Sequence, residues 1–173
     1  LGADEFVVVA HQVTHRDVAA QLAKAVVDAL GEPYAIDHQP EHVSASVGVV
    51  LGQRDAGSTD SLMLDASLAM GEAKRAGGAR FSLFEPAMRA RAARRATIET
   101  DLRGAIERGA LTVAYQPIVS LASRRCVGME ALVRWQHPLL GNVPPLEFVE
   151  VAEDIGLISE LGRFVMDEAC RAC

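Results

Sequence analysis

Two adjacent carboxylates near the amino end of the chain could hold a metal ion beside a phosphate. Asp4 and Glu5 follow Gly2 within the first six residues. Mg²⁺ prefers oxygen ligands and shares them with nucleotide phosphates, and a glycine turn lets backbone N–H groups approach the same phosphate. An acidic hairpin turn that binds nothing has the same composition, so these residues alone leave both interpretations open.

Other reactive side chains favour ordinary structural roles. His11 and His15 have the spacing of two metal ligands on a helix, but they lie where a helix begins, and a third ligand is missing. Cys170 and Cys173 lack the second pair that a four-ligand zinc site needs. A proline follows His137, which indicates an ordinary loop histidine.

Four arginines in one stretch could bind an anion. They lie within a run rich in Ala, Arg and Glu: Arg89, Arg91, Arg94 and Arg95. An anion site needs donors that converge on one point. Arginines at this spacing point in several directions around a helix, so we predict a solvated helix face here.

The composition excludes several classes of protein. The 173 residues carry 17 Lys and Arg against 23 Asp and Glu, and this net charge of −6 argues against a nucleic acid polymer as partner. No apolar run approaches the roughly 18 residues that cross a bilayer. Three cysteines are too few for a disulfide framework. We expect a cytoplasmic protein, with any membrane attachment outside this sequence.

Strand and helix patterns alternate in the first half, where they must position Asp4 and Glu5. The apolar run Phe6–Ala10 is typical of a strand buried on both faces, and the alternation over 43–49 predicts a second strand. Between them, Thr14 and Asp17 resemble a weak capping box. A helix follows with an apolar stripe of Val18, Leu22, Val26 and Leu30 that ends at Gly31. Further along come a helix between Ser58–Asp60 and Gly77–Gly78, a strand at Phe81–Phe84 and a long helix at Ala87–Arg108.

The second half has a different pattern. Two strand-like runs joined by a polar turn should pair as a hairpin, and two helical segments separated by a glycine should follow a loop. The elements in order are the strands Leu111–Leu121 and Cys126–Trp135, the loop Gln136–Pro144, and helices from Pro145 to Gly156 and from Leu157 to Cys170. Together the two halves predict a mixed α/β protein with two clusters of strands.

We expect two domains and a linker: residues 1–85, a linker helix at 86–108, and residues 109–173. The sequence starts without Met, inside a predicted strand, and it ends as abruptly. We therefore expect a piece of a longer protein.

Three runs in the first half occur in a meaningful order: GADEF at residues 2–6, SVGV at 46–49, and Ala69, Ala73, Lys74 and Gly77 near a helix end. They resemble the signature hairpin, the S-I-G-V strand and the A-L-Y-x-A-K-x-x-G helix end of the GGDEF diguanylate cyclase family. The resemblance implies the C-terminal part of an α/β nucleotide-cyclase-like domain. It also implies a nucleotide site with Gly2, Asp4, Glu5 and Lys74, in which Asp4 binds a divalent metal and Lys74 meets the phosphates of GTP.

Departures from that pattern predict a damaged cyclase site. Ala3 replaces a glycine, and its Cβ crowds the phosphate and disfavours a positive φ, at a cost of roughly 1 kcal/mol or more. Gly78 replaces a phosphate-facing Arg, and Gly71 replaces the usual Tyr. We expect no cyclase activity from this half.

A second set of motifs begins at residue 115: YQPI at 115–118, GMEALVRW at 128–135, and then Gly141, Pro145, Phe148, Ala152, Glu153 and Gly156. These resemble the opening of EAL-type cyclic di-GMP phosphodiesterases, which are (β/α)₈ barrels. The resemblance implies that Glu130, near the carboxyl end of a barrel strand, is a catalytic ligand of Mg²⁺ or Mn²⁺. It further implies substrate contacts from Gln116, Leu132 and Arg134. Taken alone, Glu130 could be a surface acid and Arg134 a salt-bridge partner.

We therefore predict cyclic di-GMP signalling. The leading hypothesis is a metal-dependent phosphodiesterase in the parent protein, with an inactive or regulatory GGDEF part that could bind GTP. A non-catalytic receptor for cyclic di-GMP or GTP is the alternative, and an active diguanylate cyclase is the third. The other EAL metal ligands would follow Cys173, so these residues alone should not catalyse. Open strand edges predict poor stability unless the chain forms a homodimer or is joined to the rest of the protein.

Overall fold

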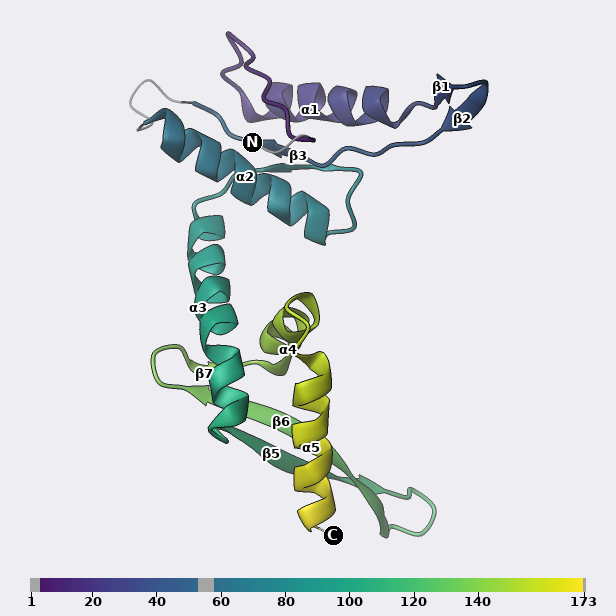
Figure 1. The fold of residues 1–173 in the computed structure, drawn as a ribbon, viewed down its shortest axis with the longest axis vertical. Coiled ribbons are helices and arrows are strands. Elements are labelled where there is room, and N and C mark those ends of the chain that lie inside the picture. The colour runs from purple at the N-terminus through teal and green to yellow at the C-terminus, as the bar shows by residue number, and fades with distance from the viewer. Residues whose placement is uncertain (1–3, 53–57, 173) are drawn as a thin grey trace. The chain divides into compact units, whose positions relative to one another are not determined.

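The computed structural model describes residues 4–52 and 58–172 (Figure 1). It divides into two compact units, Leu1–Ala90 and Arg91–Cys173. Both units combine helices and strands, which confirms the mixed α/β class. Within the described residues, no helix combines the length and the apolar composition that a bilayer crossing requires.

The first unit is built around a short parallel strand pair. Strands β3 (Val47–Val49) and β4 (Phe81–Leu83) pair in parallel, and helices α1 (Arg16–Gly31) and α2 (Thr59–Arg75) both contact them. The buried side chains of the two helices are mostly alanines: Ala19, Ala23, Ala69 and Ala73. Because alanine adds little bulk, the helix backbones lie close to the strands. Helix α3 (Ala87–Glu107) then continues into the second unit.

The start and end signals of α2 were predicted correctly. Ser58 is the N-cap of α2 and accepts a hydrogen bond from the backbone N–H of Ser61. Gly77 and Gly78 end the same helix with φ values of 105° and 68°, which glycine adopts without strain. The strand at β4 and the long helix α3 are also confirmed.

The predicted strand Phe6–Ala10 is wrong, because the structure contains no strand over this run and leaves it exposed. Phe6 is 88% exposed, and no described strand pairs with the run. A strand needs neighbours for its backbone N–H and C=O groups, so apolar composition alone cannot make one. The predicted strand over 43–49 is shortened for the same reason to β3, where β4 supplies the partner.

Two further expectations for the first unit need correction. The N-cap of α1 is His15, without a side-chain hydrogen bond, so the capping box at Thr14 and Asp17 does not form. The structure also contains a hairpin that the sequence patterns missed, β1 (Tyr34–Ile36) with β2 (Gln39–Glu41). Its two-residue turn, Asp37 and His38, has φ values of 48° and 67°. Such turns usually contain Asn-Gly or Asp-Gly, and Asp-His is a weaker signal.

The second unit is a three-stranded antiparallel sheet with helices on one face. Strand β6 (Cys126–His137) lies between β5 (Leu111–Val119) and β7 (Gly141–Val143). The β5–β6 hairpin was predicted, whereas β7 lies within the stretch predicted as a loop. Helices α4 (Pro145–Asp154) and α5 (Ile158–Ala172) follow, as the sequence indicated. The core combines α3, the sheet and both helices through Ile98, Leu102, Leu111, Trp135, Val143, Phe148, Val151, Leu157 and Leu161.

Candidate functional site

The four residues predicted to bind cyclic di-GMP or its metal share one face of the β5–β6 hairpin. Gln116 lies directly opposite Glu130 in the antiparallel register. Leu132 and Arg134 follow Glu130 at two-residue intervals. Side chains alternate between the faces of a strand, and directly opposed residues share a face. The structure therefore brings these four residues onto one surface.

The opposite face of the hairpin is fixed by the core. Leu111 and Trp135 are buried there, and Trp135 packs edge-on against Phe148 of α4 with 5.7 Å between ring centroids. The hydroxyl of Tyr115 donates a hydrogen bond of 3.0 Å to the carbonyl oxygen of Glu168 on α5. A one-residue slip would move all these side chains to the wrong face, so the core determines which face carries Glu130.

The carboxylate of Glu130 is exposed and uncommitted. It makes no hydrogen bond or ion pair with any residue that the structure describes. Its expected place near the carboxyl end of a strand is wrong, because β6 continues seven residues beyond it to His137. Pairing with β5 and then β7 extends the strand past the acid.

Arg134 is half-buried, and its guanidinium donates a 2.8 Å hydrogen bond to the carbonyl oxygen of Val133. It forms no ion pair with a carboxylate in residues 4–52 or 58–172. At the rise of a strand, Arg134 and Glu130 are separated by about 13 Å along β6. The two side chains therefore do not neutralise each other.

The predicted nucleotide residues of the first unit are less completely described. Asp4 is exposed in a turn, Glu5 is half-buried, and Lys74 is exposed in the last turn of α2. Gly2 lies outside the described residues. Among those described, no group of three or more His, Cys, Asp or Glu side chains could hold a metal ion. Asp4 and Glu130 thus each fit the role of a single oxygen donor, without completing a metal site.

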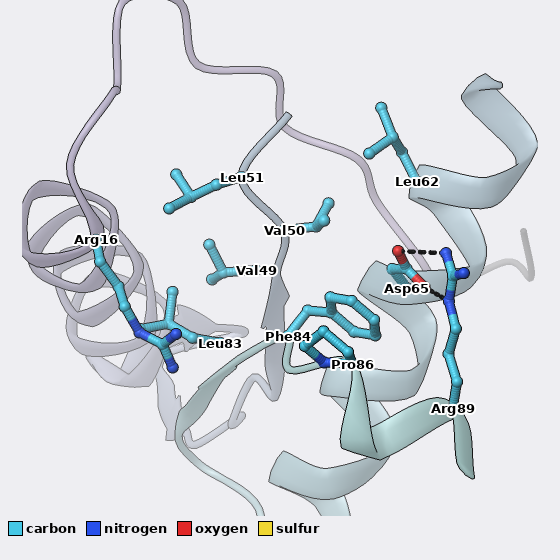
Figure 2. A pocket seen from close by; sticks show the side chains of 10 residues that line it. All are labelled: Arg16, Val49, Val50, Leu51, Leu62, Asp65, Leu83, Phe84, Pro86 and Arg89. Atoms are coloured by element: carbon cyan, nitrogen blue, oxygen red, sulfur yellow. Dashed lines mark hydrogen bonds and ion pairs between the residues drawn. The ribbon is translucent and has the colours of Figure 1, made fainter. Parts of the chain in front are cut away.

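A cavity of about 440 Å³ that the sequence did not predict lies at the carboxyl ends of β3 and β4 (Figure 2). Its apolar wall includes Val49 and Leu83, and Asp65 and Arg89 lie together on one side. The guanidinium of Arg89 donates to both carboxylate oxygens of Asp65, at 2.6 and 2.8 Å. The hydrogen bond and negative charge of Asp65 raise the pKa of Arg89 above its ordinary value. Arg16 on the other side pairs with Glu85, so carboxylates already engage both arginines.

The prediction of a solvated arginine face on α3 is wrong. Besides the Arg89 pair, Arg94 contacts Glu147 at 2.6 Å, and Arg95 contacts Asp154 at 2.6 Å. The acids belong to α4 and lie more than fifty residues further along the chain, so the local spacing of the arginines could not reveal them.

The remaining reactive side chains have mixed outcomes. His11 and His15 are exposed, as predicted. Cys170 is an exposed free thiol, and Cys173 lies outside the described residues. His137 was expected in a loop, but it is the last residue of β6 and is only 3% exposed. Its partner Asp101 lies 36 residues earlier on α3, so the local sequence could not show this contact.

Comparison with known families covers most of the chain. Residues 1–80 match the family described as "Diguanylate cyclase, GGDEF domain", and residues 99–173 match the "EAL domain" family. This chain is a GGDEF–EAL family member. All predicted nucleotide residues lie in the GGDEF match, and Gln116, Glu130, Leu132 and Arg134 lie in the EAL match. The expectation of a GGDEF region followed by part of an EAL domain is confirmed.

Several named proteins resemble the chain over nearly its whole length. It is 40% identical to "Bifunctional diguanylate cyclase/cyclic di-GMP phosphodiesterase MucR" of Pseudomonas aeruginosa over 99% of this chain and 25% of that protein. It is 35% identical to "Cyclic di-GMP phosphodiesterase PdeR" of Escherichia coli over 98% of this chain and 25% of that protein. The GGDEF–EAL chain thus spans about a quarter of the length of these relatives.

Among solved structures, the chain is similar to "PaMucR Phosphodiesterase, c-di-GMP complex". The identity is 45%, and the match covers 43% of this chain and 30% of that chain with a TM-score of 0.41.

Proposed function

We propose that this chain belongs to a metal-dependent cyclic di-GMP phosphodiesterase, in which the GGDEF region regulates the EAL domain. The observation that carries the proposal is the uncommitted carboxylate of Glu130 on the same hairpin face as Gln116, Leu132 and Arg134. A phosphodiesterase needs an anionic metal ligand and a separate cationic phosphate contact. This face offers both without an internal ion pair between them.

Each residue has a chemical role in this proposal. Glu130 would supply one oxygen ligand to Mg²⁺ or Mn²⁺, and the bound metal would activate water for attack on the phosphodiester. Arg134 would donate to a phosphate oxygen with its forked N–H groups. Leu132 lies between them in sequence and would provide an apolar contact, while the Gln116 amide beside Glu130 would orient the ligand.

The spacing of Glu130 and Arg134 along the strand is compatible with a dinucleotide ligand. Glu130 and Arg134 lie about 13 Å apart along the strand. This is the separation of the two backbone positions, and a ligand with two phosphates and two bases is long enough to contact side chains from both. Cyclic di-GMP has this form, and the names of the relatives support it as the ligand.

The first region has a regulatory role in this proposal. Asp4 and Lys74 retain the GGDEF pattern, while Ala3, Gly71 and Gly78 depart from it. We assign residues 1–85 to the GGDEF region, 86–108 to a linker helix and 109–173 to the EAL part. GTP bound by the first region would alter hydrolysis by the second. If titration with GTP leaves hydrolysis unchanged in the whole protein, this regulatory role is rejected.

A non-catalytic cyclic di-GMP receptor is the second candidate. It is supported by the three other residues of the hairpin face, whose contacts with the ligand need no metal ion. Arg134, Leu132 and Gln116 could still bind the ligand. Both candidates bind cyclic di-GMP, but only the phosphodiesterase hydrolyses it.

The deciding experiment measures cyclic di-GMP hydrolysis and binding by the whole protein with Mg²⁺ or Mn²⁺. Glu130→Gln should lower hydrolysis by at least about a hundredfold, because it removes an anionic metal ligand while keeping the side-chain shape. Arg134→Ala should weaken binding roughly tenfold or more, because a charged hydrogen bond is lost. Glu107→Gln, an exposed acid at the end of α3, is the matched control.

The outcomes separate the candidates. Wild-type binding without hydrolysis would select the receptor. Hydrolysis by Glu130→Gln at the wild-type rate would refute the role of this face in catalysis.

A further inference from the structure

The His137 ring is held by hydrogen bonds at both of its nitrogen atoms. Nδ1 lies 3.1 Å from the backbone nitrogens of both Leu139 and Leu140, which can only donate. Nδ1 must therefore be the acceptor and carry no proton. The proton of the ring then lies on Nε2, which donates to Oδ2 of Asp101 at 2.8 Å. The backbone donors thus select one tautomer of this histidine.

The ring is also fixed by packing. Its centroid lies 5.1 Å from that of Trp135 in an edge-on arrangement, and Trp135 in turn packs edge-on against Phe148. With 3% of its surface exposed, His137 has little room to rotate. A rotation large enough to release Asp101 would also break the two hydrogen bonds to the turn after β6.

We propose that His137 is a positioning residue that couples helix α3 to strand β6. Asp101 lies on α3, whereas His137 ends the strand that carries Glu130 and Arg134. A displacement of α3 at Asp101 is therefore transmitted through one rigid ring to the β6–β7 turn and to the end of β6. The importance of Glu130 and Arg134 rests on the proposed function, but the coupling itself does not.

The tautomer can be tested directly by long-range ¹H–¹⁵N correlation of the histidine rings in this chain. His137 should show an unprotonated Nδ1 and a protonated Nε2. The sequence contains five histidines, and the other four are exposed, so they serve as internal references. A proton on Nδ1 of His137 would overturn the proposal.

Two substitutions test the hydrogen bonds at Nδ1 and at Nε2 of His137 separately. The side-chain oxygen of His137→Asn can replace the Nδ1 acceptor, whereas the side-chain amide of His137→Gln can replace the Nε2 donor. Amide exchange at Leu139 and Leu140 should therefore stay near wild type in His137→Asn. It should become about tenfold faster in His137→Gln, as expected when a hydrogen bond is lost. Exposed His42→Asn is the control and should change neither amide.

The coupling is tested with Asp101→Ala, which keeps His137. The Asp101 side chain is 43% exposed, so this variant should still fold. Its amides in β6 from 131 to 135 should exchange about tenfold faster, while those of Leu139 and Leu140 stay protected. Wild-type exchange throughout β6 would refute the coupling.

These exchange measurements use the chain without ligand. They therefore test the coupling of α3 to β6 even if the protein hydrolyses no cyclic di-GMP. In an active whole protein, Asp101→Ala should raise KM more than it lowers kcat, because Arg134 contacts the ligand and not the attacking water.

Discussion

Replacing Gly48 with alanine should strongly destabilise the GGDEF part. Gly48 lies in β3 against the backbone of α2. A Cβ built on it would lie 2.0 Å from the carbonyl oxygen of Ala66 and 2.4 Å from the backbone nitrogen of Met70. Both atoms belong to the helix backbone, so no side-chain rotation relieves the overlap.

The size of the effect follows from the displacement that a Cβ would require. Ordinary contacts begin at 3.4 Å, so α2 would have to move by about 1.4 Å from β3. Such a movement disturbs the buried alanines Ala69 and Ala73 on the same helix. Overpacking typically costs about 1–3 kcal/mol, and we expect about 3 kcal/mol here because the obstacle is backbone.

Gly71→Ala is the matched control with the opposite sign. Gly71 lies inside α2, and the nearest atoms to its Cβ would be the Arg75 guanidinium nitrogens at 3.5 and 3.8 Å, an ordinary contact. Alanine is a better helix former than glycine by about 1 kcal/mol. This variant should therefore be more stable than wild type by roughly 0.5–1 kcal/mol.

Urea unfolding can follow the two parts separately. Far-ultraviolet circular dichroism reports on both, whereas the single tryptophan, Trp135, reports only on the EAL part. Gly48→Ala should lower the dichroism midpoint of the GGDEF part, Gly71→Ala should raise it, and neither should move the fluorescence midpoint. If Gly48→Ala unfolds at or above the wild-type urea concentration, the close approach of α2 and β3 is wrong.

Two further predictions concern the helices. Asp65→Ala should speed amide exchange in the first turn of α3, since the 7% exposed Asp65 side chain would no longer hold Arg89. Arg16→Ala should have little effect, because that ion pair is 55% and 52% exposed, and equal effects from both would contradict the reasoning. Phe148→Ala should destabilise the EAL part by about 3–5 kcal/mol, measured as a lower fluorescence midpoint on urea unfolding. An unchanged midpoint would mean that Phe148 does not support Trp135.

Elements with complete local signals were predicted well. The cap at Ser58 and the glycines after α2 interact with residues within about one helical turn. The β5–β6 hairpin follows from the alternation of side chains on both sides of a polar turn. The run Phe6–Ala10 has the composition of a strand, but it has no partner strand among the described residues. Sequence patterns therefore succeed where hydrogen bonds close locally and fail where the partner is distant.

The candidate site shows the same division. Motif resemblance selected Gln116, Glu130, Leu132 and Arg134, and strand alternation alone places the last three on one face. The sequence could not show that Glu130 lies in the middle of β6, since this depends on how far β5 and β7 extend the pairing.

By itself, then, the order of residues determined the family, the helices and the set of side chains that share the hairpin face. Tertiary structure decided that His137 is buried against Asp101, that Arg94 and Arg95 are paired with α4, and that only glycine fits at position 48. These features join residues that are 18 or more positions apart in the chain. Local propensity acts over a few neighbouring residues, so only the packed chain can bring such partners within contact distance.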